Sequence, residues 1–160
     1  MEERHDREQY FFDAVTVARL ADRLEGYESP CCLCAPRVAE ELHHRGHAVT
    51  CLDLDERFAR LPGFRRYDLT RPDWLAERFG VILCDPPFFN VSLKVLRHAI
   101  RQLAHHDAGQ PLLLGYLQRR AAAVERTFAE FGLRATAERF GYETVVEGAK
   151  NDIVLFANRD

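Results

Sequence analysis

The feature that most constrains the fold of this chain is a regular alternation of short apolar runs with amphipathic stretches. The spacing of apolar residues predicts helices and strands in turn, as expected for a doubly wound and mostly parallel sheet. The predicted strands are residues 31–35, 48–52, 63–67, 81–84 and 111–116. The predicted helices are residues 9–25, 37–44, 72–79, 92–105 and 120–131.

The end of the chain departs from this alternation. Residues 133–142 and 152–157 have the pattern of two strands, and the segment between them is too short for a crossover helix. The sequence therefore predicts a C-terminal antiparallel hairpin at one edge of the sheet, in a single α/β domain spanning residues 1–160.

Composition narrows the class of protein. Hydrophobic residues make up 47% and charged residues 29%, as in ordinary globular chains. No apolar run approaches the roughly 20 residues that cross a bilayer, and the charged N-terminus is unlike a signal peptide. We therefore expect a cytoplasmic protein that makes no membrane contact.

The cysteines are odd in number and lie in or beside predicted strands, where free thiols pack as small hydrophobes. The alternative is a zinc site formed by Cys31 and Cys34 with His43, His44 or His47. A strand alternates its side chains between two faces, so this set does not form a four-ligand cage, and we expect no metal. The five cysteines are Cys31, Cys32, Cys34, Cys51 and Cys84.

The net charge of −3 excludes a protein that holds nucleic acid by overall charge. Arginines are nevertheless concentrated in one stretch. We interpret most of them as ion-paired surface residues, and a basic rim around an active-site mouth remains the alternative. They are Arg57, Arg60, Arg65, Arg66 and Arg71.

Ligands of open α/β sheets bind at the carboxyl ends of the strands. One predicted strand ends there in Asp85-Pro86-Pro87-Phe88-Phe89. Two prolines fix the backbone and remove two N–H donors, while the aspartate accepts hydrogen bonds and the phenylalanine offers a surface for stacking. The pattern predicts a site that binds an amino group. The alternative is a Pro-Pro turn in which Asp85 caps the next helix.

Asp85-Pro86-Pro87-Phe88 resembles the Asp/Asn-Pro-Pro-aromatic motif of amino-methyltransferases. Further segments occur in the order found in the probable N6-adenine methyltransferase family, which includes lysine methyltransferases of eukaryotic elongation factor 1-alpha and a zinc-knuckle ribosomal RNA adenine methyltransferase. The likeness covers nearly the whole chain and implies a Rossmann-like class I methyltransferase that uses S-adenosyl-L-methionine (SAM). The segments are residues 9–12, 29–36, 52–58 and 67–68.

The resemblance also implies roles for the acidic strand ends. Asp53, or else Asp55, accepts the ribose hydroxyls of the cofactor, since one carboxylate can accept two hydrogen bonds. The other is then expected to cap a helix. Asp68 matches a position that meets the adenine amino group, with an ordinary turn residue as the alternative. Asp85 borders the cofactor as well as the acceptor.

Two further segments match cofactor-binding positions of the family. Gln9, Tyr10 and Phe11 resemble a segment that packs over the methionine end of SAM, and the alternative is a plain helix start. Ala35 and Pro36 stand where most class I methyltransferases have a glycine-rich loop. The missing glycines argue against a nicotinamide dehydrogenase.

Methyl transfer depends chiefly on positioning. We expect Asp85 and the Pro86 carbonyl to accept the two N–H bonds of the acceptor amine, with Pro87 fixing the turn. Phe88 and Phe89 hold the acceptor flat, and Tyr116 is a further substrate-binding candidate.

The predicted function is therefore N-methylation of adenine N6 in a nucleic acid, with structured or ribosomal RNA favoured. A protein lysine substrate is the main alternative. A non-catalytic scaffold that keeps the cofactor fold, or a generic nucleotide-binding protein, fits less well because the tetrapeptide is intact and no phosphate-binding glycine loop is present. A protein partner is a further expectation, because the chain has no added recognition module.

Overall fold

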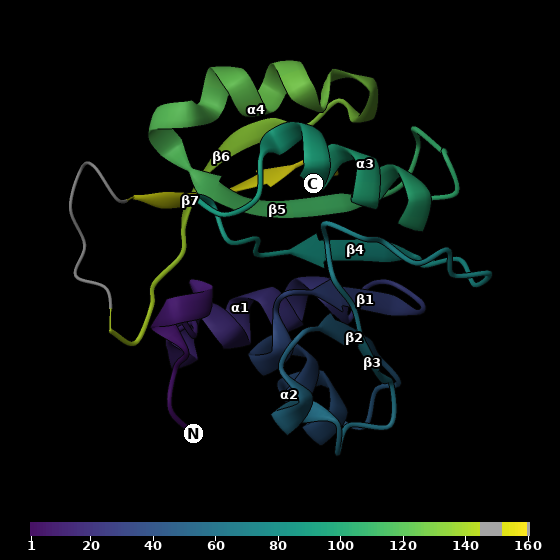
Figure 1. Cartoon of the computed structure of the whole chain (residues 1–160), viewed down its shortest axis with the longest axis vertical. Helices are drawn as coiled ribbons and strands as arrows, with labels where there is room; N and C mark the ends of the chain where they lie inside the picture. The colour runs from purple at the N-terminus through teal and green to yellow at the C-terminus, as the bar shows by residue number, and fades with distance from the viewer. Residues whose placement is uncertain (145–151, 160) are drawn as a thin grey trace.

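The computed structural model describes residues 1–144 and 152–159, which contain a mixed sheet in the order β3-β2-β1-β4-β5-β7-β6 (Figure 1). Strands β1 to β5 pair in parallel, and β7 is antiparallel to both of its neighbours, β5 and β6. This confirms the predicted fold class. The last strand, β7, lies between β5 and β6, so that β6 forms the edge of the sheet. The strands are β1 (Pro30–Leu33), β2 (Thr50–Asp53), β3 (Phe64–Arg66), β4 (Val81–Cys84), β5 (Leu112–Leu117), β6 (Arg134–Arg139) and β7 (Ile153–Ala157).

The helices form two pairs. Helix α1 packs on α2, which contacts β1 and β2, and α3 packs on α4, which contacts β5 and β6 (Figure 1). Asp13 and Ser92 cap α1 and α3 by accepting backbone N–H bonds, as the preference of such residues for N-caps predicts. The α-helices are α1 (Ala14–Leu24), α2 (Pro36–His44), α3 (Leu93–Leu103) and α4 (Ala121–Thr127). Short 3₁₀ turns are η1 (His5–Arg7), η2 (Glu56–Phe58), η3 (Gln118–Arg120) and η4 (Ala129–Phe131).

The strand order places a ligand site between β1 and β4. The chain moves in one direction from β1 to β3 and in the other from β4 to β5, so the order reverses at the β1–β4 pair. Cys34 and Asp85 follow these two strands, and Asp85 donates its N–H to the Leu33 carbonyl at 3.1 Å. The tetrapeptide therefore begins at the switch point of the sheet.

The first helix is shorter than its apolar spacing predicts. It begins at Ala14, whereas residues 9–13 are not helical and Phe12 forms an antiparallel bridge with Tyr142. Asp13 donates its N–H to the Gly141 carbonyl at 2.9 Å, a bond across the fold that replaces one within a helix. The predicted start at residue 9 was wrong because periodicity cannot reveal a partner more than 100 residues away.

The predicted helix at residues 72–79 is absent. Trp74 packs against the His105 ring at 4.5 Å, and the His105 ring donates to the Leu75 and Glu77 carbonyls at 2.8 and 3.0 Å. In a helix over these residues the Leu75 carbonyl would instead accept from the backbone N–H of Phe79. The segment is held by side chains after α3 instead.

Four of the cysteines lie buried within β1, β2 and β4, and Cys34 follows β1 with φ of 57°. Burial raises the pKa of each of these thiols above its usual value. No group of three or more metal-ligating side chains gathers in residues 1–144 and 152–159. None of the helices in the same residues is long and apolar enough to span a membrane.

Candidate active site

The carboxyl ends of β1 to β4 surround a cavity of about 370 Å³, which we call the strand-end cavity. Acidic side chains and the N-terminal segment form most of its polar wall. Its lining residues include Gln9, Tyr10, Phe11, Cys34, Pro36, Asp53, Asp55, Tyr67, Asp68, Thr70, Asp85 and Pro87. The structure thus brings together acids that follow three different strands, because the carboxyl ends of parallel strands lie at one edge of the sheet.

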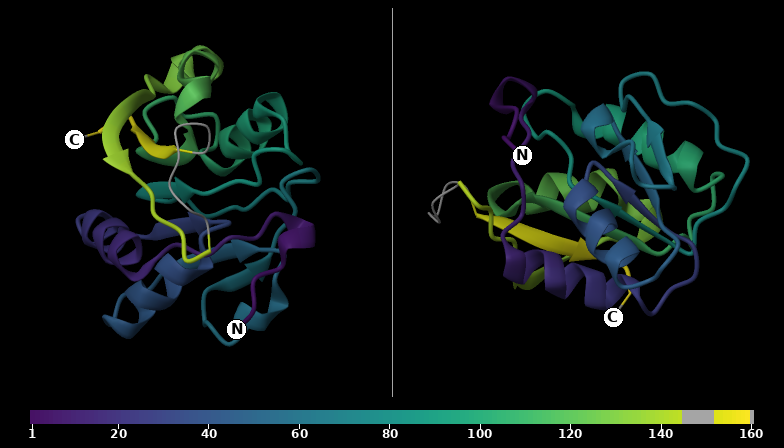
Figure 2. Two further views of the ribbon diagram at one scale, coloured as in Figure 1. Left: turned by 90° about the vertical axis from the view of Figure 1, so that its left-hand side faces the viewer. Right: turned by 90° about the horizontal axis from the view of Figure 1, so that it is seen from below.

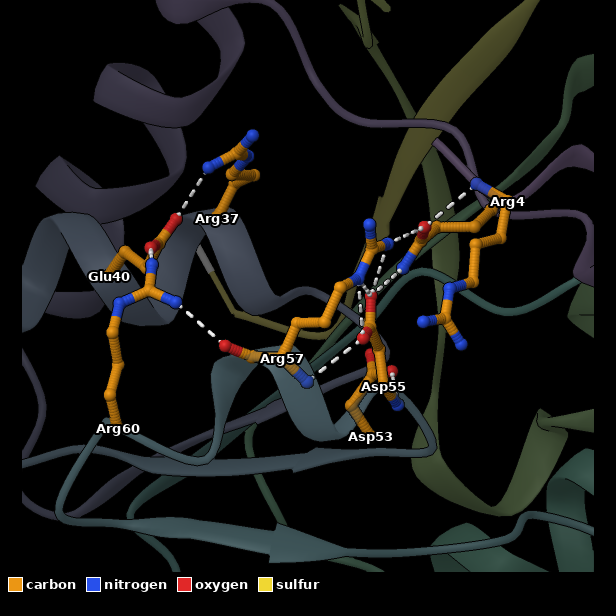
Figure 3. Close-up of polar contacts among 8 residues, drawn as sticks. Arg4, Arg37, Glu40, Asp53, Asp55, Arg57 and Arg60 are labelled. Atoms are coloured by element: carbon orange, nitrogen blue, oxygen red, sulfur yellow. Dashed lines mark hydrogen bonds and ion pairs between the residues drawn. The ribbon is translucent and has the colours of Figure 1, made fainter. Parts of the chain in front are cut away.

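Asp53 and Asp55 lie two residues apart and have different environments. Asp53 ends β2, and burial raises the pKa of its carboxyl to about 6, although its Oδ1 accepts the Asp55 N–H at 2.8 Å. Asp55 caps η2 and pairs with Arg57 at 2.7 Å (Figure 3). Burial opposes ionisation of Asp55, but the bonds from Arg57 and Gln9 outweigh it and hold its pKa below the usual range. Asp55 is thus engaged, and Asp53 is the more available acceptor.

Asp68 and Tyr67 follow β3 in the same cavity. The Asp68 carboxylate accepts the backbone N–H and the hydroxyl of Thr70 at 2.9 and 2.7 Å, which lowers its pKa. Asp68 is therefore a turn residue that also faces the cavity. The Tyr67 hydroxyl is buried and makes no hydrogen bond with any residue that the structure describes. A polar ligand in the cavity would satisfy this hydroxyl.

The N-terminal segment crosses the same end of the sheet beside the chain that follows β6 (Figure 2). Gln9 fastens it by donating to Asp55 at 2.8 Å and accepting from the Arg4 N–H at 2.9 Å. Glu8 fastens it on the other side, where its carboxylate accepts the Phe89 N–H at 3.0 Å. The segment thus connects Asp55, after β2, with Phe89, the residue after the tetrapeptide.

The tetrapeptide is held from two directions. The Tyr142 hydroxyl donates to Asp85 Oδ1 at 3.0 Å, and Phe88 packs edge-on against Tyr116 at 5.0 Å. Burial raises the pKa of Asp85 well above its usual value, the charge of Asp53 adds to the rise, and the Tyr142 bond opposes it. The Pro86 carbonyl accepts no hydrogen bond from the described residues and is free to meet a ligand.

A second cavity, of about 190 Å³, adjoins the tetrapeptide, and we call it the aromatic cavity. Three residues line both cavities: Glu8, Tyr10 and Asp85. Asp85 therefore stands where the two cavities meet. The other residues of the aromatic cavity are Pro86, Phe88, Phe89, Leu117, Tyr142 and Ile153.

Two predicted site residues lie outside both linings. Ala35, between β1 and α2, is 2% exposed, and its neighbours Cys34 and Pro36 line the strand-end cavity instead. Tyr116 is 1% exposed and packs edge-on against the Phe88 ring. All other predicted site residues line one cavity or both.

Sequence reasoning missed four residues of the aromatic cavity. Glu8 lies next to the predicted Gln9, but nothing in the pattern gave it a role. Leu117, Tyr142 and Ile153 come from the C-terminal strands and the loop between them. None of these belongs to a motif, and the contact of Tyr142 with Asp85 spans 57 positions, so no local signal indicates it.

Comparison with known proteins identifies the family. The model of the family described as "Probable N6-adenine methyltransferase" matches residues 3–160. The chain belongs to this family. It is a methyltransferase, and the match confirms the family and the SAM cofactor that the sequence predicts.

Solved structures agree on the fold of this N6-adenine methyltransferase family member. A candidate RNA methyltransferase from Pyrococcus horikoshii superposes with a TM-score of 0.64 at 16% identity, covering 98% of this chain and 89% of its own. Magnesium protoporphyrin IX methyltransferase from Synechocystis with bound SAM gives 0.61 at 14%, covering 89% and 78%. A glycopeptide N-methyltransferase in complex with SAM gives 0.59 at 15%, covering 94% and 96%. No curated protein sequence matches significantly.

Proposed function

We propose that this protein transfers a methyl group from SAM to the N6 amino group of adenine in RNA. The observation that carries the proposal is the place of Asp85 in the walls of both cavities. An acceptor amine in the aromatic cavity and a cofactor in the strand-end cavity would meet at this carboxyl. Holding the two reactants in line supplies most of the rate enhancement in such a displacement.

The strand-end cavity fits the cofactor. Its volume of about 370 Å³ lies within the usual range for small-molecule sites. The buried Tyr67 hydroxyl, which has no hydrogen-bond partner among the described residues, could bond to a polar group of the cofactor. Asp53 would accept the ribose hydroxyls, and Asp68 would face the adenine amino group. Gln9 and Tyr10 would cover the methionine end. SAM supplies an electrophilic methyl carbon on its sulfonium.

The aromatic cavity fits a flat acceptor with one amino group. Phe88, Phe89, Leu117 and Ile153 supply apolar walls, on which a base can stack or pack. Asp85 accepts one N–H of the acceptor amine, and the free Pro86 carbonyl accepts the other. These bonds turn the nitrogen lone pair toward the methyl carbon.

A set of arginines without carboxylate partners favours nucleic acid. They lie around the carboxyl ends of the β-strands, where the phosphates of a bound RNA would pass. None forms an ion pair with a described residue. Arg65 and Arg78, by contrast, lie near the amino ends of the strands and pair with Glu77 and Asp107. Arginines are the usual phosphate ligands of nucleic-acid-binding proteins. The unpaired set is Arg4, Arg7, Arg66, Arg119 and Arg120.

Protein lysine is the second candidate. Glu8 and Asp85 both line the aromatic cavity, and two carboxylates among aromatic rings also suit an ammonium group. Glu8 accepts the Phe89 N–H, so part of its charge is already engaged. A lysine would also have to lose a proton before attack, because its reference pKa is about 10.4.

The test uses SAM labelled in the methyl group, with purified RNA and protein fractions of a cell lysate as acceptors. Label that is released by nuclease and identified as N6-methyladenosine would support the proposal. Label retained in protein as methyllysine would overturn it. The Asp85→Ala variant controls for contaminating activity.

The same assay also tests whether the unpaired arginines bind RNA. The double variant Arg7→Glu, Arg66→Glu should raise the KM for RNA at least tenfold and reduce the salt dependence of binding. Arg134→Glu, which changes an exposed and unpaired arginine at the start of β6, should have little effect. Equal effects of the two charge reversals would contradict a role for the set.

A further inference from the structure

Tyr142 lies in the wall of the aromatic cavity, yet no part of the proposed cofactor or acceptor recognition uses it. Its hydroxyl donates to Asp85 Oδ1 at 3.0 Å. Oδ2 of Asp85 receives no hydrogen bond from any residue that the structure describes. One oxygen of the catalytic carboxyl is therefore held, and the other is available to a ligand.

The protein backbone holds Tyr142 in this place. Its antiparallel bridge to Phe12 fixes the main chain, and the two rings lie 5.2 Å apart. Gly115 of β5 also lies against the carboxyl: a Cβ there would overlap the Phe140 ring and would come to 3.4 Å from Asp85 Oδ1, an ordinary contact distance. Asp85 Oδ1 is thus confined between the Tyr142 hydroxyl and strand β5.

We propose that Tyr142 is a positioning residue for methyl transfer, whose hydroxyl holds Asp85 Oδ1 so that Oδ2 accepts the acceptor N–H and then its proton. This inference rests on the proposed N-methylation. When the acceptor nitrogen bonds to the methyl carbon, the carbon–sulfur bond breaks and its electron pair stays on sulfur. The nitrogen then carries one proton too many, and that proton passes to Asp85 Oδ2.

Electrostatics at Asp85 support this arrangement. Burial and the charge of Asp53 raise the pKa of Asp85, which makes it a better proton acceptor than an exposed aspartate, while the Tyr142 bond restrains the rise. The other titratable groups near Asp85 are Cys34 and Cys84, whose thiol pKa values lie well above the usual range, and Glu8 of the N-terminal segment. Removing the hydroxyl should therefore raise the Asp85 pKa further.

The experiment compares Tyr142→Phe with the wild type. Phenylalanine keeps the ring that packs on Phe12, so the fold should persist. At neutral pH and saturating SAM, kcat should fall roughly ten- to hundredfold, as expected for loss of a hydrogen bond to a charged group, with the SAM dissociation constant unchanged. The acid limb of the kcat profile should move to higher pH. Asp53 titrates in both proteins, so the difference between the profiles reports Asp85.

Thr16→Val is the matched control. The Thr16 hydroxyl accepts the Gly141 N–H at 2.8 Å, so this change also removes a buried hydroxyl that holds the same segment. It leaves the Tyr142 hydroxyl in place and should not move the acid limb. An equal displacement in both variants would show that Tyr142 acts only through packing and would overturn the proposal.

A second measurement does not require turnover. The carboxyl carbon of Asp85, labelled with ¹³C and assigned with Asp85→Asn, is titrated by NMR in both proteins. A higher Asp85 pKa in Tyr142→Phe supports the contact, and identical titrations refute it. If the wild type methylates neither RNA nor protein amines, the proposed function fails, and the titration still decides whether Tyr142 controls Asp85.

Discussion

The two cavities that meet at Asp85 are built in different ways. The strand-end cavity takes its acids from the ends of the parallel strands β2, β3 and β4. The aromatic cavity gathers residues from the N-terminal segment, the tetrapeptide and the C-terminal strands. The comparison indicates that the sheet topology fixes the proposed cofactor site, while the proposed acceptor site depends on the segments that pack around it.

The largest effect should come from the carboxyl that the cavities share. Asp85→Ala should lower kcat by on the order of 10²–10³, a loss comparable with removal of one transition-state hydrogen-bond partner in other enzymes. The SAM dissociation constant should change less than threefold, because Asp85 lies at the edge of the strand-end cavity. Single-turnover kinetics and calorimetry measure the two quantities separately.

Retained activity of Asp85→Ala would show that the chemistry lies elsewhere. Loss of SAM binding would instead show that Asp85 belongs to the cofactor site alone. Circular dichroism of the variant checks that the fold is unchanged, so that a loss of kcat can be assigned to the reaction.

This difference between the cavities also explains how much the sequence could predict. Asp53, Asp68 and Asp85 were predictable because parallel strands bring their carboxyl ends to one edge. The sequence also placed Asp53 before Asp55 for the ribose and expected the other acid to cap a helix, and Asp55 does cap η2. The limit lies in the contacts of Asp55 with Arg57 and Gln9, which the sequence does not indicate.

The part of the aromatic cavity that comes from the C-terminal strands lay beyond sequence reasoning for a different reason. Tyr142 reaches Asp85 because Phe11, Phe12 and Asp13 pair with the chain after β6. That pairing was hidden by apolar spacing that also fits a helix, so the same feature produced both the wrong helix start and the missed residue. Contacts between distant segments leave no local pattern.

The next prediction distinguishes the roles of Asp53 and Asp55. Asp53→Asn should weaken SAM binding roughly ten- to hundredfold, because an acceptor of two hydroxyl groups loses its charge. Asp55→Asn should chiefly lower thermal stability, since it breaks the partly buried ion pair with Arg57. Calorimetric titration and thermal unfolding of both variants test this division. A larger loss of SAM affinity in Asp55→Asn would exchange the two roles.

Burial of Asp53 should make the free energy of unfolding depend on pH by about 3 kcal/mol. Its folded-state pKa of about 6 lies above the usual value of 3.8, so the folded protein binds the proton more tightly than the unfolded chain. The free energy of unfolding contributed by Asp53 is therefore highest below pH 4 and falls as the pH rises to 6. Above that, the ligand-free Asp53→Asn variant should be more stable than the wild type.

Denaturant unfolding of the two ligand-free proteins at pH 4 and pH 8 measures this effect. The difference between them should appear at pH 8 and shrink toward zero at pH 4. A difference that is the same at both pH values would mean that Asp53 is ionised as easily in the fold as in the unfolded chain. The affinity of the wild type for SAM should also fall below pH 6, because the Asp53 carboxylate takes up a proton there.

The smallest effect concerns the outer wall of the aromatic cavity. Phe89 is 71% exposed, and Phe89→Ala should raise the acceptor KM about fivefold, the lower end of the range for stacking on a base. SAM affinity and thermal stability should stay unchanged, because the ring touches neither the strand-end cavity nor the core. Phe88→Ala is the contrast, since it also removes the contact with Tyr116 and should destabilise the fold. Steady-state kinetics on an RNA acceptor, with melting curves of both variants, would separate acceptor binding from packing. If Phe89→Ala instead altered SAM affinity as much as the acceptor KM, the two cavities would act as one site.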